Sequence, residues 1–269
     1  MPGLAGGRSE QSSLFSTVLG VRGRNMTDVR LEGDVFEPYA LLKTLHILLI
    51  ATWLGMDFGT FISYKKMRDP SLSIDTRKQM YRVFALIDMG PRSSLVLMLT
   101  LGVALSHMGS WAFAGAGGRA FAIVTAIVGI LWVAGLWHQY WVHEALPDNP
   151  RPELHVRAQK VFRPVDIWLR VGLAGGLAVA AVVSLAGAEG PIYADWLAWK
   201  LILFAGIVMS GVGIRMFLPA VASAVKDIFT KGSTPEREAA LTEGSRRTVR
   251  FVYAIWVLII AITWVAIAG

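Results

Sequence analysis

Residues 39–62 form an almost uninterrupted apolar run, and this run limits what the chain can fold into. At about 1.5 Å per residue, a helix of this length crosses the ~30 Å hydrocarbon core of a bilayer. Comparable runs follow at roughly 86–107, 119–142, 165–187, 196–218 and 249–268. With 54% of the 269 residues hydrophobic, the chain is too apolar for an ordinary soluble domain. The sequence therefore predicts an all-α fold, a polytopic membrane bundle of six transmembrane helices.

The start of the chain differs in composition from the rest. Residues 1–36 are polar and mixed in charge, which predicts a loose tail over 1–36 and a transmembrane domain over 37–269. No apolar core follows Arg8, so we do not expect a signal peptide. Met1 and Met26 both remain candidate translation starts. The chain has no cysteine, which excludes disulfides, thiolate zinc sites and cysteine-ligated iron–sulfur clusters.

Basic residues alternate sharply between the connections of the predicted helices. The first, third and fifth connections are rich in Lys and Arg, the second has only Arg119, and the fourth has none. Basic connections stay in the cytoplasm by the positive-inside rule, so both termini are expected on the outer, periplasmic side of the cell (inner) membrane. The net charge of +7 is then explained by topology. The expected surroundings are a lipid bilayer, and no nucleic-acid partner is expected.

Part of the sequence is repeated. The pattern V-F-x-x-[VI]-D-x-x-x-R occurs at 83–92 and again at 161–170, which predicts a repeated helical hairpin whose equivalent helices run in the same direction. The pattern places Asp88 four residues before Arg92, and Asp166 four residues before Arg170. Two interpretations remain open. Each arginine forms a local ion pair and is held at the headgroups, or the arginines bind an anion such as a lipid phosphate or a porphyrin propionate.

Polar and aromatic residues form one stripe along the predicted helix 39–62. The spacing of 3, 4, 3, 4 and 7 residues places them on a single helical face: Lys43, His46, Ile50, Trp53, Asp57 and Tyr64. Ionisable groups that face lipid are costly, so this face is expected to turn towards the protein interior or a cavity. The function is expected where the stripe meets its neighbours.

Three titratable groups are predicted at similar depth near the outer face: His46, His107 and Lys200. A neutral imidazole can bind haem iron or copper, and helical bundles commonly hold haem b. The alternative for His46 is a hydrogen bond between helices, and for His107 a position at the membrane interface. Methionines in or beside these helices make copper a second candidate metal, but methionine at helical spacing more often serves packing.

Short motifs resemble one known family. Residues 42–47 (LKTLHI) followed by 53–55 (WLG) resemble the first helix of the HemJ-type protoporphyrinogen oxidases and the related CopD-like membrane proteins. Residues 81–84 with Pro91 resemble their second helix, and 196–201 (WLAWKL) resemble the start of a later one. The segment after the first helix differs from HemJ, and this chain has six predicted helices rather than four.

The resemblance implies a function in which His46 is associated with haem b and Lys200 is its functional partner. On this hypothesis the protein is an oxidoreductase or electron-transfer subunit, with His107 as a second iron ligand and Asp57 as a proton relay. Its electron partner would be a redox protein or a quinone. The alternative is a non-enzymatic protein, either for CopD-like metal uptake or as a structural subunit. A homo-oligomer and a hetero-oligomer both remain open.

Overall fold

The computed structural model describes residues 37–144 and 151–269. The chain divides into two compact units, Met1–Ala40 and Leu41–Gly269, and the description below concerns the second. The tail expected over 1–36, with both candidate translation starts, lies outside the described residues.

Helices make up almost all of the described chain, and these residues form no strand. They are α2 (Pro38–Met67), α3 (Ile74–Ile87), α4 (Met89–Met108), α5 (Gly115–Gln139), the π-helical turn η1 (Tyr140–Glu144), α6 (Glu153–Leu185), α7 (Asp195–Lys231) and α8 (Pro235–Ala268). Within residues 37–144 and 151–269, six spans are long and apolar enough to cross a membrane, with α3 and α4 together forming one of them. The predicted all-α bundle of an integral membrane protein is confirmed.

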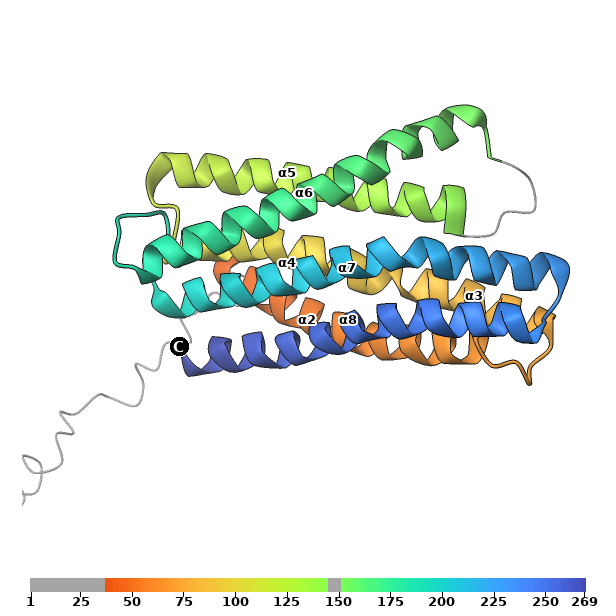
Figure 1. Ribbon diagram of the computed structural model, residues 1–269. Helices are drawn as coiled ribbons and strands as arrows, with labels where there is room; N and C mark the ends of the chain where they lie inside the picture. The colour runs from red at the N-terminus through yellow and green to blue at the C-terminus, as the bar shows by residue number, and fades with distance from the viewer. Residues whose placement is uncertain (1–36, 145–150) are drawn as a thin grey trace, which may run out of the picture. The chain divides into compact units, whose positions relative to one another are not determined.

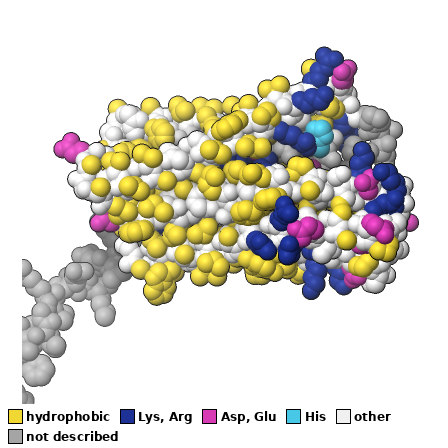
Figure 2. All heavy atoms as spheres, in the orientation of Figure 1, with side chains coloured by type: hydrophobic (Ala, Val, Ile, Leu, Met, Phe, Trp, Pro, Cys, Tyr) yellow, Lys and Arg dark blue, Asp and Glu magenta, His cyan; other side chains and the backbone are white. Residues whose placement is uncertain are grey.

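Consecutive spans run in opposite directions (Figure 1). The α2–α3 and α7–α8 connections, η1 and the start of α6 lie at one end of the bundle (Figure 1). We call it the basic end because Lys and Arg side chains gather there (Figure 2). At the opposite end the α4–α5 and α6–α7 connections are joined by backbone hydrogen bonds, from Phe113 to Pro191 (2.9 Å) and from Tyr193 to Trp111 (2.8 Å). Between the two ends, apolar side chains cover the visible sides of the spans, as a lipid environment requires.

Several helices extend further than the apolar runs predicted. The span expected to begin near 165 starts at Glu153, and the one expected to begin near 249 starts at Pro235. The expected end near residue 218 is wrong, because α7 continues through Pro219 to Lys231. A proline removes one helical hydrogen bond. Here the continuation is stabilised by burial of α7 residues beyond the proline against α2 and α8: Val221, Ala224, Val225 and Ile228.

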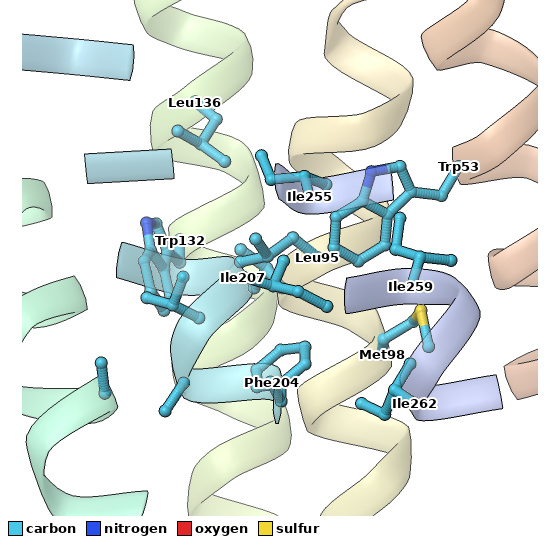
Figure 3. Packing of buried hydrophobic residues seen from close by; sticks show 14 of the residues in the cluster. Trp53, Leu95, Met98, Trp132, Leu136, Phe204, Ile207, Ile255, Ile259 and Ile262 are labelled. Carbon is cyan, nitrogen blue, oxygen red and sulfur yellow. The ribbon is translucent and has the colours of Figure 1, made fainter. Parts of the chain in front are cut away.

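The core lies midway along the spans and draws on six helices, α2 and α4 to α8 (Figure 3). Trp53 of α2, Trp132 of α5 and Phe204 of α7 supply its large aromatic side chains, and Ile255 and Ile259 of α8 pack among them. Interdigitated side chains of this kind associate helices in lipid through van der Waals packing. The core therefore fixes the positions of the polar groups described next.

The two copies of the repeat occupy equivalent places. α4 and α6 run in the same direction (Figure 1). Asp88 lies fourteen residues after the start of its span at Ile74, and Asp166 lies thirteen residues after Glu153. Neither aspartate lies at the end of its span, because each span begins before the apolar run does.

Candidate functional site

The polar stripe of α2 faces the bundle interior along most of its length. Trp53 and Tyr64 are buried, and the Tyr64 hydroxyl donates to Ser245 Oγ of α8 at 2.6 Å. The Asp57 carboxylate accepts a hydrogen bond from the Trp256 indole of α8. Lys43, at the start of the stripe, is exposed. Apart from Lys43, the expectation that this face turns inward is supported.

A cavity of about 160 Å³ lies where this stripe meets α4, α7 and α8. Among its lining residues is an unusual set of charged and amide side chains for a membrane interior: Asp57, Asp88, Arg92, Gln139, Arg170 and Arg215. Ionisable groups within spans are expensive in lipid, and they mark functional sites by default. The cavity therefore brings Asp57 of the stripe together with Asp88, Arg92 and Arg170 of the repeat.

Asp166 organises one half of the charges around the cavity. Its side chain is fully buried and accepts from the Trp132 indole at 2.7 Å. It pairs with Arg170 Nε at 3.0 Å and with Arg215 Nη1 at 2.8 Å. The guanidinium carbon of Arg170 also lies 5.1 Å from the centre of the Trp132 ring. One buried carboxylate thus holds two arginines from two helices.

Arg92 organises the other half. It pairs with Asp88, four residues earlier, and with Glu144 of η1 at 2.9 Å. The amide of Gln139 donates to the same Glu144 carboxylate at 2.9 Å. The π-helical turn η1 therefore supplies Glu144, and the last residue of α5 supports it. π-turns of this kind are frequent at functional sites.

The predicted local ion pairs of the repeat are confirmed at both copies. The proposed placement at the headgroups is wrong for Arg170, whose side chain is only 4% exposed and lies inside the bundle. Each arginine also binds groups beyond its own pair, as described above.

The charges of the cluster do not balance. Three arginines face four carboxyl groups: Asp57, Asp88, Glu144 and Asp166. Among the ion pairs of residues 37–144 and 151–269, none includes Asp57. The cluster therefore has one carboxyl group in excess, and Asp57 is the one without a basic partner.

His46 lies further along α2, towards the opposite end. It is half-buried, and its Nδ1 atom is buried without a hydrogen-bond partner among the described residues. The ring faces Gly102 of α4, where an added Cβ would stand 3.5 Å from Cε1. Lys200 of α7 is close enough for its charge to interact with His46, and its Nζ lies 5.2 Å from the Trp196 ring centre. The predicted convergence of His46 and Lys200 is supported.

His107 has a different environment. Its Nδ1 atom is 2.8 Å from the carbonyl oxygen of Phe113, in the connection between α4 and α5. This bond ties the ring to the connection and leaves Nε2 as the nitrogen open to a ligand. Within the described part of the chain, no three or more histidine, aspartate or glutamate side chains group as a metal site.

Sequence reasoning missed several members of the charged cluster. Arg215 is one of only two charged residues in the apolar run 196–218, the other being Lys200, and a charge within a span was a readable signal. Glu144 and Gln139 lie at the end of a span, where polar residues are common and therefore indicate no site. Trp256 is 199 positions from Asp57, and no local pattern predicts their bond.

Comparisons with known proteins give no family for the chain: no protein-family model, no curated protein and no solved structure matches it.

Proposed function

We propose that this integral membrane protein binds haem b through His46 and acts as a membrane oxidoreductase or electron-transfer subunit. One observation carries the proposal: a buried imidazole nitrogen without a partner, beside a lysine, in a motif that resembles a haem-linked one. An unpaired buried polar atom costs free energy, so a ring left in this state favours a ligand. A neutral imidazole is the form that binds iron.

The residues around His46 suit a haem in part. Lys200 is the cation available to pair with a propionate, whereas Arg92 and Arg170 already pair with carboxylates elsewhere in the bundle. His107 would be a second iron ligand through Nε2, because its Nδ1 is engaged by the Phe113 carbonyl. Bound haem would supply one-electron redox chemistry, with a quinone or a redox protein as the electron partner. Asp57, lining the charged cavity, is the proposed proton relay.

An absorption spectrum of the purified protein tests the haem proposal. We expect a Soret band that shifts on reduction when the protein is produced with haem available. A colourless protein under the same conditions would contradict the proposal.

The second candidate is a non-enzymatic membrane protein, for metal uptake or as a structural subunit. The observation in its favour is the bond between Asp57 and Trp256, which is how a structural buried carboxylate is satisfied. The unpartnered nitrogen of His46 argues against it, because a structural histidine would be hydrogen-bonded. A spectrum without haem, together with an intact fold, would favour this candidate.

We also propose that the basic end faces the cytoplasm and that the C-terminus lies outside. Reporter fusions at Ser233, between α7 and α8, and at Gly269 should then report opposite sides, with Ser233 inside. An active periplasmic reporter at Ser233 would contradict this orientation, and equal signals at both sites would contradict the span count.

A further inference from the structure

Two buried polar atoms beside the charged cavity have no partner among the described residues. They are the acceptor Oε1 of Gln139 and the donor Nη2 of Arg170, and both residues line the cavity. The two residues are 6% and 3% exposed. Leaving such atoms unpaired is costly, so the cavity is suited to a ligand that accepts from the arginine and donates to the amide.

The remaining walls of the cavity are apolar and aromatic apart from Thr60 and Thr248. Trp53, Phe61, Tyr64 and Phe84 line it, with aliphatic residues between them. Its volume is about 160 Å³. A dry cavity of ~150 Å³ is large enough to bind benzene. The size and walls therefore fit a single six-membered ring.

Charge favours a neutral ligand over an anion. The cluster already has one carboxyl group more than it has arginines, and an added anion would deepen this excess in a medium of low dielectric constant. A neutral ring with polar oxygens satisfies Arg170 and Gln139 without adding charge.

We propose that the cavity binds the head group of a quinone, a neutral ring that carries oxygen atoms and dissolves in the bilayer. A carbonyl oxygen of the oxidised ring accepts from Arg170, and a hydroxyl of the reduced ring donates to Gln139. The site needs no haem, and it stands on different residues from those around His46.

Duroquinone, a fully methylated benzoquinone, is a suitable probe because it has no ring position open to amine addition. In nanodiscs of one lipid composition, it should quench tryptophan fluorescence saturably, since Trp53 lines the cavity. Gly211→Leu should abolish the saturable quenching. Gly211 lines the cavity, and a Cβ there meets nothing within 4 Å, so the new side chain enters the cavity without a clash.

Gly172→Leu is the matched control, because Gly172 is exposed on α6 and a Cβ there also meets nothing within 4 Å. This variant should bind like the wild type. Gln139→Leu should weaken binding of the reduced probe by roughly 2- to 10-fold, as expected for one hydrogen bond. Absence of saturable quenching, equal quenching in Gly211→Leu, or tighter binding of benzoate than of duroquinone would each overturn the proposal.

Discussion

Replacing Asp166 by Asn should destabilise the protein by about 3–5 kcal/mol, the cost typical of breaking a buried ion pair. The carboxylate is fully buried and is the shared partner of Arg170 and Arg215. Asparagine keeps the bond from Trp132 but removes the negative charge with which both Arg170 and Arg215 pair. The free energy of unfolding can be measured by titration with a denaturing detergent in mixed micelles.

Two variants control this measurement. Asp227→Asn removes a carboxylate of similar local pattern, paired with Lys231 four residues on, but at an exposed site, so it should cost under ~1 kcal/mol. Asp166→Asn combined with Arg215→Leu should be less destabilised than Asp166→Asn alone, because one of the uncompensated charges is gone. If Asp166→Asn costs no more than Asp227→Asn, the buried cluster does not support the fold as described.

Replacing His46 by Ala should remove haem binding completely while leaving the protein inserted and folded. The His46 side chain is half-buried and faces α4. Its Nδ1 atom has no hydrogen-bond partner among the described residues, so the substitution leaves no buried group without its partner. Haem content per protein, from the pyridine haemochrome spectrum, is the measurement.

His155→Ala is the matched control for that experiment. His155 is also half-buried, but its Nδ1 is 2.9 Å from His138 Nε2, between α5 and α6. The control should keep its full haem content. His107→Ala should at most alter the spectrum, since water can replace an interfacial ligand. If His46→Ala retains haem, His46 is not the iron ligand and the haem proposal fails at this residue.

The six spans could be predicted because a bilayer imposes its thickness on the chain as long apolar runs. The ends of the spans could not be predicted this way, because helices continue as polar segments beyond the bilayer. Local signals for these ends exist: Thr234 precedes Pro235, and its hydroxyl accepts from the Arg237 amide at the start of α8. Thr234 and Pro235 lie outside the apolar run, and a search for such runs passes over them.

The site was predictable to the extent that periodicity encodes a helix face. The stripe containing His46, Trp53 and Asp57 follows from the spacing alone. The separation of His46 from the charged cavity could not be predicted from the spacing, because it depends on which helices pack beside each turn of α2. The joining of Arg92 and Arg170 around one cavity likewise depends on α7, whose Arg215 shares Asp166 with Arg170.

The central claim is that the bundle holds two separate sites, one at His46 and one at the cavity beside Asp57. The most direct measurement determines haem content and duroquinone binding on the same preparations of wild type, His46→Ala and Gly211→Leu. We predict that His46→Ala loses haem but still binds the quinone, and that Gly211→Leu keeps haem but no longer binds the quinone. Loss of both ligands in either variant, in a protein that remains folded, would contradict the claim.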